Sequence, residues 1–302
     1  MAFTLKQKLH AWWEGYDLDA LEAARARSQV SDRDDDVSEE EPVVDPNVME
    51  PDWIAFLQML WGTGHMRPGT RDYYLNDSKV MLLTDSTTVI ELGAGLGAYG
   101  RVIGEANICY VDCYEAHDLT VETSEKCPAS AEERKFTSYS LLPDGELPSD
   151  RKYNRVLSNR FLHRMENPLG TLQNIKALLK EDGSILLNEY TAGAKGLLDE
   201  ETQAIMDGFA APHALISRDV YVTALEEMGF EVRTIENRSA EHLAHIAAGW
   251  LQMDQRVSDE DAKFDIAKYG RFIAQETNRW AAMSKALKEG RLEYSRIFAL
   301  RK

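Results

Sequence analysis

Basic residues are scarce in this sequence, and long apolar runs are missing. Lys and Arg number 34 against 51 Asp and Glu, which gives a formal net charge of −17 over 302 residues. A chain this acidic is a poor ligand for phosphate backbones, so nucleic acid is not expected as a partner. No run reaches membrane-spanning length, and no apolar core of signal-peptide length follows the first residues. We therefore expect a soluble, cytoplasmic protein with no membrane partner.

Cysteine is also rare. Cys109, Cys113 and Cys127 are odd in number and match no zinc spacing. Free or buried thiols in a reducing compartment are the simplest interpretation, and no metal site is predicted. No internal repeat divides the chain, whose length suits one large α/β domain with additions.

The first 51 residues are predicted to lie outside this domain. Residues 4–27 carry apolar side chains at helical spacing, whereas residues 31–50 are acidic, contain proline and are typical of a solvated linker. The first helix could pack on the main domain or on a second copy of the chain, so a homodimer is a reasonable expectation. The domain itself is predicted to span residues 52–302.

The sequence does contain a glycine-rich turn between an apolar strand and a helix. Val89 to Leu92 is typical of a buried parallel strand, and Tyr99 to Glu105 of a helix. Between them, Gly93, Gly95 and Gly97 allow a tight turn and let a ligand approach the backbone closely. The free N–H groups at the start of the helix face the same crevice. The sequence therefore predicts a nucleotide site at the carboxyl end of a strand.

Two kinds of nucleotide fit this turn. Gly93-x-Gly95-x-x-Ala98 satisfies the dinucleotide fingerprint, which leaves an NAD(P)-dependent oxidoreductase as an alternative. Glu91 argues against it, because a dinucleotide strand is normally apolar there, whereas a carboxylate suits the cationic amino group of S-adenosylmethionine. The seven residues from Glu91 to Gly97 match E/D-x-G-x-G-x-G in full. In this segment the chain resembles the class I S-adenosylmethionine-dependent methyltransferases, of which this is the first motif.

The order of the remaining elements strengthens the resemblance. Residues 153–168 are similar to the family's fourth motif, with Asn154 in place of the usual Asp, and residues 179–183 are similar to the turn before its fifth strand. The resemblance implies an α/β fold: a Rossmann-like, seven-stranded, mostly parallel sheet with an antiparallel last strand, N-terminal helices and a helical cover at about 191–290. Strands are expected at 89–92, 108–114, within 132–142, and at 153–158, 184–189, 229–236 and 292–300. Helices are expected at 52–60, 99–105, 116–127, 171–179, 217–228 (with Ser217 as N-cap), 240–253 and 261–287.

The resemblance also implies S-adenosylmethionine as the cofactor. Glu115 ends the second strand and is expected to accept hydrogen bonds from both ribose hydroxyls, whereas its competitor Asp112 falls on the opposite face. The Trp-Gly-x-Gly…Pro-Gly segment from Trp61 is similar to one that helps cover the cofactor in phosphoethanolamine and related N-methyltransferases. Ser140 stands near the place of the family's adenine-binding acid, which leaves the adenine contact open. The predicted cofactor-binding residues are Glu91, Gly93, Ala94, Gly95, Gly97, Glu115, Ser140, Leu141, Asn159, Trp61 and Arg67.

Methyl transfer depends on alignment of the nucleophile and on exclusion of water. His163, after the fourth strand, is the best-placed base if a proton must leave, and Tyr190 is the second catalytic candidate. The alternative for His163 is a structural histidine bonded to a backbone carbonyl. The aromatic residues near the site could surround a cationic substrate or pack in the core. The predicted substrate-binding residues are Tyr73, Tyr74, Glu189 and His213.

The sequence thus favours a methyltransferase that acts on a small molecule. N- or S-methylation of a small amine or amino acid, such as methionine, is preferred over O-methylation of a carboxylate or a natural-product hydroxyl. An NAD(P)-dependent oxidoreductase is the more distant alternative. A non-catalytic binding protein is a third, because Asn154 and the missing acid near Ser140 depart from the family pattern.

Overall fold

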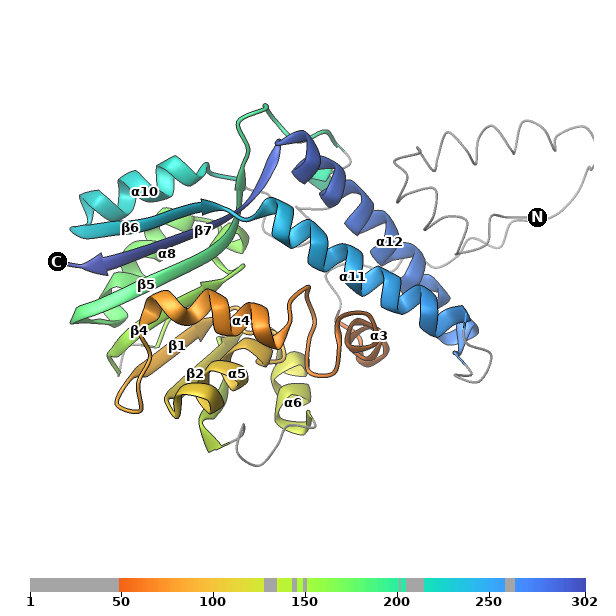
Figure 1. The fold of residues 1–302 in the computed structure, drawn as a ribbon, viewed down its shortest axis with the longest axis horizontal. Helices are drawn as coiled ribbons and strands as arrows, with labels where there is room; N and C mark the ends of the chain where they lie inside the picture. The colour runs from red at the N-terminus through yellow and green to blue at the C-terminus, as the bar shows by residue number, and fades with distance from the viewer. Residues whose placement is uncertain are drawn as a thin grey trace, which may run out of the picture.

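Seven strands form one sheet at the centre of the molecule (Figure 1): β1 (Thr88–Leu92), β2 (Tyr110–Glu115), β3 (Thr137–Leu141), β4 (Tyr153–Asn159), β5 (Leu179–Ala192), β6 (Phe230–Asn237) and β7 (Leu292–Arg301). Their order across the sheet is β3-β2-β1-β4-β5-β7-β6. Neighbours from β3 to β5 are parallel, whereas β7 lies antiparallel between β5 and β6. This is the predicted Rossmann-like sheet with its antiparallel last strand.

The computed structural model describes residues 49–127, 135–142, 146–148, 151–200, 202–204, 215–258 and 264–302. The predicted helix at 4–27, nearly all of the acidic linker and His213 lie outside these ranges. None of the helices in the described ranges combines the length and the apolarity needed to cross a membrane. The named helices of the described ranges, with two short 3-10 helices labelled η, are α3 (Pro51–Trp61), α4 (Arg71–Ser78), η1 (Lys79–Met81), α5 (Ala98–Asn107), α6 (Asp118–Lys126), η3 (Leu162–Arg164), α8 (Pro168–Leu178), α10 (Arg218–Glu227), α11 (Ser239–Ser258) and α12 (Ile266–Glu289).

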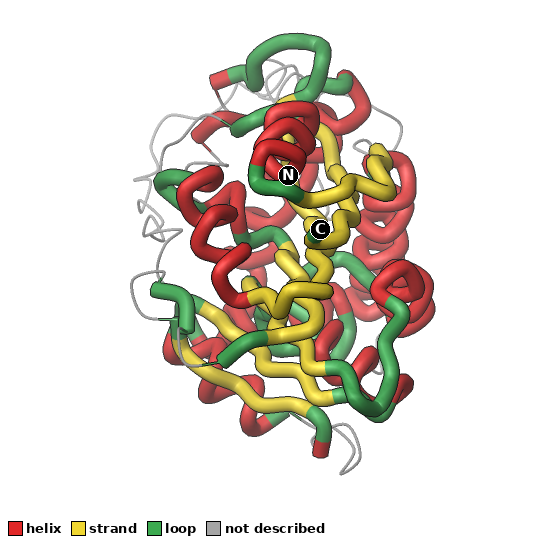
Figure 2. Tube along the Cα trace, turned by 90° about the vertical axis from the view of Figure 1, so that its left-hand side faces the viewer, coloured by secondary structure: helices red, strands yellow, loops and turns green. Residues whose placement is uncertain are grey.

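Both faces of the central strands are buried. Ile90 and Leu92 share a hydrophobic core with residues of α8 and α10. Val89 and Val111 pack with residues of α4 and α5 in a separate core. Figure 2 shows the sheet as a twisted layer with helices on either side. Burial on both faces is the physical reason for the nearly continuous apolar run of β1.

The strand order reverses next to β1. From β1 the sheet continues through β2 and β3 on one side, and through β4 and β5 on the other. Ligands in open α/β sheets bind outside the carboxyl ends of the strands at such a switch point. The glycine turn follows β1 directly, so the fold places it at this point.

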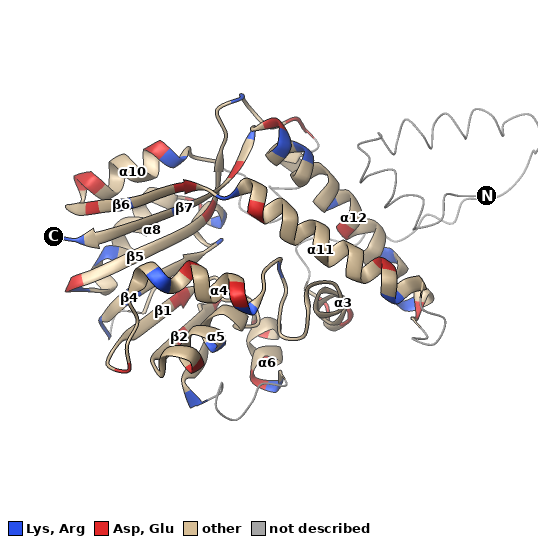
Figure 3. Cartoon of the chain, in the orientation of Figure 1, with Lys and Arg blue, Asp and Glu red and all other residues tan. Residues whose placement is uncertain are grey.

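Helices α3, α11 and α12, which we call the helical cover, pack together beyond the carboxyl ends of the parallel strands (Figure 1). Trp61 of α3 meets Trp280 of α12 edge-on, with ring centroids 5.1 Å apart. The buried carboxylate of Glu276 accepts hydrogen bonds from the indole N–H groups of Trp53 at 3.0 Å and Trp280 at 2.9 Å, and it pairs with Arg279 at 2.6 Å. Charged residues are spread along α11 and α12 (Figure 3), as amphipathic helices require.

The range 191–290, predicted as one helical cover, is divided in the structure. α10 and β6 belong to the sheet and its flanking layer, and only α11 and α12 belong to the cover. Ser217 caps α10 as predicted, since its hydroxyl accepts a hydrogen bond from the N–H of Val220.

Two further segments differ from the sequence prediction. Helix α4 was not predicted; Thr70 caps it by accepting a hydrogen bond from the N–H of Tyr73. Residues 179–183, predicted as a turn, form the first part of β5. The register between β4 and β5 shifts there: Tyr153 of β4 pairs with Leu179, whereas Arg155 pairs with Ser184.

Candidate functional site

The glycine turn has a backbone that requires glycine. Gly93, Gly95 and Gly97 have φ angles of 76°, 59° and 77°, in the left-handed region that L side chains rarely adopt. A Cβ on Gly97 would also lie 2.2 Å from the ring of Tyr139. The N–H groups of Gly93 and Ala94 bond to the carbonyl of Tyr114 at the end of β2, at 3.0 and 3.1 Å. The turn is therefore fixed to the neighbouring strand and leads straight into α5.

Glu115 lies beside this turn. One carboxylate oxygen accepts a hydrogen bond from the N–H of Gly95 at 2.8 Å, and the other from the N–H of Ala116 at 2.9 Å. Arg67 and Arg164 approach the same carboxylate at 3.6 and 3.5 Å. Burial alone would raise the pKa of Glu115, but the two guanidinium groups and the two N–H donors hold it below its ordinary value. The turn thus carries an ionised carboxylate.

Asp112, the competitor of Glu115, is engaged elsewhere. Its carboxylate accepts hydrogen bonds from the hydroxyls of Tyr153 at 2.8 Å and Ser138 at 2.5 Å, and it pairs with Arg151 at 2.6 Å. These contacts lie between strands, away from the glycine turn.

Glu91, which the sequence predicts as a cofactor contact, is fully buried. Its carboxylate accepts hydrogen bonds from the N–H of Gly100 at 2.9 Å and from the side-chain amide of Asn159 at 3.0 Å. Burial raises its pKa to about 7 against these bonds. Glu91 therefore ties the start of α5 to the end of β4.

Residues 62–69, which we call the strap, run across the glycine turn. Arg67 donates hydrogen bonds from Nη1 to the carbonyls of Gly93 at 2.8 Å and Asn159 at 3.1 Å. Arg101 donates to the carbonyl of Gly64 at 3.2 Å and so holds the strap to α5. The predicted cofactor contact Arg67 thus fills the crevice with its own guanidinium.

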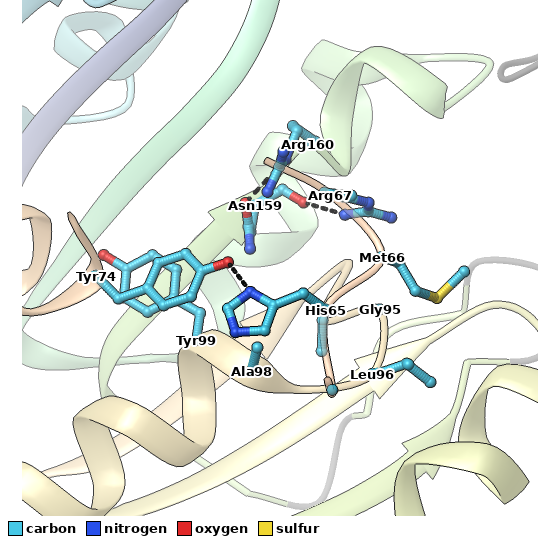
Figure 4. Close-up of a pocket in the computed structure, with 12 residues that line it drawn as sticks. His65, Met66, Arg67, Tyr74, Gly95, Leu96, Ala98, Tyr99, Asn159 and Arg160 are labelled. Carbon is cyan, nitrogen blue, oxygen red and sulfur yellow. Dashed lines mark hydrogen bonds between the residues drawn. The ribbon is translucent and has the colours of Figure 1, made fainter. Parts of the chain in front are cut away.

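A small pocket lies under the strap, lined by residues of the strap, of the glycine turn and of the end of β4. Figure 4 shows the stacked rings of Tyr74 and Tyr99 beside His65, with Arg67 and Arg160 next to Asn159. The guanidinium of Arg67 occupies the carbonyls of Gly93 and Asn159 at this place. A ligand that binds these carbonyls must therefore displace Arg67.

Arg160 interacts electrostatically with four tyrosines, which we call the tyrosine chamber: Tyr73, Tyr74, Tyr190 and Tyr294. The hydroxyl of Tyr190 lies 2.7 Å from Nε2 of His242. Burial, followed by the charge of Arg160, lowers the pKa of His242 well below its ordinary value. His242 is therefore neutral, and it shares a hydrogen bond with the hydroxyl of Tyr190, whose pKa burial raises.

The predicted base His163 is paired with Glu189. Its Nδ1 lies 2.8 Å from the carboxylate of Glu189, which also accepts hydrogen bonds from the hydroxyl of Ser158 at 2.6 Å and from the N–H of Phe161 at 3.0 Å. Burial lowers the pKa of His163, and the hydrogen bond from His163 holds the pKa of Glu189 low despite burial. His163 therefore donates from Nδ1, which leaves Nε2 as the basic nitrogen. The carboxylate of Glu189, which is predicted to bind substrate, holds the turn after β4.

Four other predicted residues lie in three different parts of the fold. Ser140 and Leu141 are half-buried in β3, next to β2. Trp61 packs in the helical cover. The ring of Tyr73 lies 4.9 Å from the ring of His245, measured between centroids. The guanidinium carbon of Arg238 lies 5.7 Å from the centroid of the Tyr73 ring.

Asn154 explains one departure from the family pattern. Its side-chain oxygen accepts hydrogen bonds from the N–H of Thr88 at 3.0 Å and from its hydroxyl at 2.9 Å, at the amino ends of β4 and β1. This position lies at the opposite end of the strands from the glycine turn. The exchange of Asp for Asn at this position therefore does not touch the crevice.

Sequence reasoning missed Asp77, which anchors α4. Its carboxylate accepts hydrogen bonds from the hydroxyl of Tyr99 and from the side-chain amide of Asn188, both at 2.6 Å, and it pairs with Arg296 at 2.6 Å. These partners come from α5, β5 and β7, so their meeting is set by the fold. Arg160, His242 and Tyr294 were missed for the same reason.

Comparison with known proteins agrees with this geometry. A family profile described as a methyltransferase domain matches residues 62–235, more than half of the chain. The polyketide synthase PksM of Bacillus subtilis is 28% identical over 186 residues, which cover 53% of this chain and 4% of that protein. The chain spans about 4% of the length of the curated relatives that it matches.

Solved structures share the fold at low sequence identity. A protein described as a sarcosine dimethylglycine methyltransferase from Galdieria sulphuraria has a TM-score of 0.67 and 16% identity, over 83% of this chain and 97% of that one. Phosphoethanolamine N-methyltransferase 2 of Haemonchus contortus, in complex with phosphomonomethylethanolamine and S-adenosylhomocysteine, has a TM-score of 0.69 and 15% identity, over 86% and 61%. The [4+2]-cyclase SpnF has a TM-score of 0.63 and 15% identity, over 83% and 93%.

Proposed function

The chain belongs to the class I S-adenosylmethionine-dependent methyltransferases, and from this premise we propose that it transfers a methyl group from S-adenosylmethionine to a small molecule. One observation carries the proposal: the carbonyls of Gly93 and Asn159 and the carboxylate of Glu115 converge on a cation, the guanidinium of Arg67. S-Adenosylmethionine offers an ammonium group for the carbonyls and ribose hydroxyls for the carboxylate. When bound, the cofactor supplies an activated methyl group on a sulfonium.

The same geometry disfavours a dinucleotide. A pyrophosphate binds to the N–H groups of a glycine turn. Here the N–H of Gly95 is bonded to the carboxylate of Glu115, whose charge would repel a phosphate. The NAD(P)-dependent alternative therefore has less support.

The chain's own residues would exclude water and orient the acceptor. The helical cover lies over the carboxyl ends of the strands, where the glycine turn also lies. Tyr190, one of the four residues of the tyrosine chamber, is held in place by its hydrogen bond with His242. The basic Nε2 of His163 could take a proton from an acceptor that needs to lose one.

We infer that the acceptor atom is nitrogen or sulfur in a small amine or amino acid. The buried charge of Arg160 disfavours a protonated amine near it, so an amine would enter as the free base. A neutral amine or a thioether needs no proton removed before it attacks. O-Methylation is the alternative, and it would use His163 as the base.

Two measurements test the proposal. Calorimetry should show binding of S-adenosylhomocysteine and none of NADH, and Glu115→Gln should weaken that binding about 10- to 100-fold because it removes a charged hydrogen-bond acceptor. Incubation with methyl-labelled S-adenosylmethionine and a panel of amines, amino acids, thioethers and hydroxy acids should label an amine or thioether.

Two results would count against parts of the proposal. Labelling of hydroxy acids alone would replace N- or S-methylation by O-methylation. Binding of S-adenosylhomocysteine without transfer to any class of acceptor would favour a non-methylating role, and the [4+2]-cyclase SpnF has this fold.

A further inference from the structure

Arg160 stands at the end of β4 in a conformation that the chain does not adopt freely. Its φ angle is 56°, in the left-handed region that is unfavourable for an L-residue. Its N–H bonds to the carbonyl of Asn188 in β5 at 2.7 Å, which holds this geometry. The side chain is only 5% exposed and lines the pocket under the strap. Strain of this kind is concentrated at functional sites.

The charge of Arg160 is not neutralised by the described part of the chain. There, no carboxylate lies within ion-pair distance of its guanidinium, and the buried Nη1 has no hydrogen-bond partner. Its Nε donates to the side-chain oxygen of Asn159 at 3.3 Å, and its guanidinium carbon lies 5.9 Å from the ring centroid of Tyr294. The surroundings are phenol rings and neutral amides, which cannot cancel a full positive charge.

Three other buried arginines in the described ranges have a carboxylate or strong hydrogen-bond acceptors beside the guanidinium. Arg296 pairs with Asp77 at 2.6 Å, and Arg279 pairs with Glu276 at 2.6 Å. Arg101 donates to the carbonyl of Leu96 at 2.5 Å and to the hydroxyl of Tyr139 at 2.8 Å. Arg160 differs from them in that it has no ion pair with a described carboxylate, has an unbonded Nη1 and lines a pocket.

We propose that Arg160 binds an anionic group, a carboxylate or a phosphate, on the methyl acceptor. The inference rests on the proposed function, and it narrows the acceptor to molecules that carry a negative charge. A guanidinium binds either group through paired N–H donors, and phenol hydroxyls of the tyrosine chamber can add further donors. The same charge keeps a nearby amine unprotonated, so one residue would anchor the acceptor and keep its nucleophile free.

The position of Arg160 points to the acceptor and away from the cofactor. Glu115 lies on β2, on one side of β1, whereas the chamber residues Tyr190 and Tyr294 lie on β5 and β7, on the other side of β4. Arg160 faces those two tyrosines. The cofactor's own carboxylate is the competing source of negative charge, and the experiment must separate the two.

The experiment uses the full chain saturated with S-adenosylhomocysteine, in buffer low in chloride. Acetate and inorganic phosphate are titrated as probes by calorimetry, and the melting temperature is followed in parallel. Wild type should bind at least one probe. Tighter binding of acetate would indicate a carboxylate site, and tighter binding of phosphate would indicate a phosphate site. Arg160→Met should lose at least tenfold in that affinity, Arg160→Lys should keep part of it, and Arg233→Met, an exposed arginine on β6, should behave as wild type.

A second readout needs no ligand. Because Arg160→Met removes an uncompensated buried charge, it should melt at or above the wild-type temperature without anions. A large fall in melting temperature, or failure to fold, would show that Arg160 is structural and would overturn the proposal.

Three binding results would also overturn it. One is that neither probe binds wild type, and another is that Arg160→Met binds the probe as well as wild type does. The third is that Arg160→Met weakens binding of S-adenosylhomocysteine but not of 5′-methylthioadenosine, which lacks the amino-acid group; this would assign Arg160 to the cofactor. Failure of wild type to bind S-adenosylhomocysteine would instead contradict the proposed function itself.

Discussion

Glu91 is a buried acid whose protonation is coupled to folding. Burial raises its pKa to about 7, although the N–H of Gly100 and the amide of Asn159 donate to it. The folded chain thus binds the proton more tightly than the unfolded chain. The free energy of unfolding therefore falls as the pH rises from about 4.5 to about 7, because the unfolded chain loses this proton at a lower pH than the folded chain does.

Glu91→Gln should remove this pH dependence. A shift from 4.5 to about 7 corresponds to a change on the order of 3 kcal/mol in the free energy of unfolding across that pH range. Urea unfolding at several pH values should show wild type losing stability relative to the variant as the pH rises. Glu227→Gln, exposed on α10, is the control. Parallel pH profiles of wild type and Glu91→Gln would contradict the expectation.

At the scale of the element, the strap competes with the cofactor. Arg67 already occupies the carbonyls of Gly93 and Asn159 and lies near Glu115, which are the groups assigned to the cofactor. The strap is fixed at Gly64 by Arg101 and by the side chain of Gln58, whose oxygen accepts a hydrogen bond from Gly64 N–H at 2.9 Å. Opening the crevice therefore breaks the Arg67 contacts, whereas the anchor at Gly64 can persist.

Arg67→Met should speed the association of S-adenosylhomocysteine several-fold. The variant removes the cation that the ligand must displace and leaves the anchor at Gly64 in place. Stopped-flow binding measures the rate, and Arg71→Met, a half-exposed arginine on α4 paired with Glu105, is the control. Slower association or weaker affinity would show that Arg67 contacts the bound cofactor, as the sequence resemblance suggested.

The helical cover depends on one buried carboxylate. Glu276 satisfies two indole N–H groups and the charge of Arg279 at once. Glu276→Leu should lower the free energy of unfolding by on the order of 3 kcal/mol, since a buried charge loses its partner. Urea unfolding measures the loss. The double variant Glu276→Leu/Arg279→Leu should recover part of it, and additive losses in the double variant would argue against this pairing.

At the scale of the whole molecule, cofactor binding should stabilise the fold by mass action. S-Adenosylhomocysteine at one hundred times its dissociation constant should add about 2.7 kcal/mol to the free energy of unfolding, and NADH should add nothing. Hydrogen exchange should show the added protection at the glycine turn and in the strap. Equal stabilisation by NADH would contradict the assignment of the cofactor.

The sequence predicted what depends on local pattern. The apolar run of β1, the glycines after it and the place of Glu115 at a strand end are all properties of short segments. The sheet, with its antiparallel last strand, was implied by the resemblance of these segments to the family's motifs. The carboxylate of Glu91 accepts hydrogen bonds from the N–H of Gly100 and the amide of Asn159, which the sequence did not predict, and its contact with the cofactor stays a prediction.

Contacts between distant segments were out of reach. Asp77 meets Arg296 only because α4 packs beside β7, and α4 itself has too few apolar residues to be predicted. His242 reads as one residue of an amphipathic helix until the fold places it 2.7 Å from Tyr190. Arg160 lies within the segment similar to the fourth motif, but its proposed role comes from the absence of an acid among its described neighbours.

The insertion of β7 between β5 and β6 bears on how the molecule refolds. β5 and β7 pair from Ser184 with Leu300 to Ala192 with Leu292, so the intervening chain must loop back before that pairing can form. Pairings this distant along a chain form slowly. Tyr294 belongs to β7, so the acceptor side of the crevice would mature after the cofactor side. A refolding chain would then regain affinity for S-adenosylhomocysteine before it could hold an acceptor.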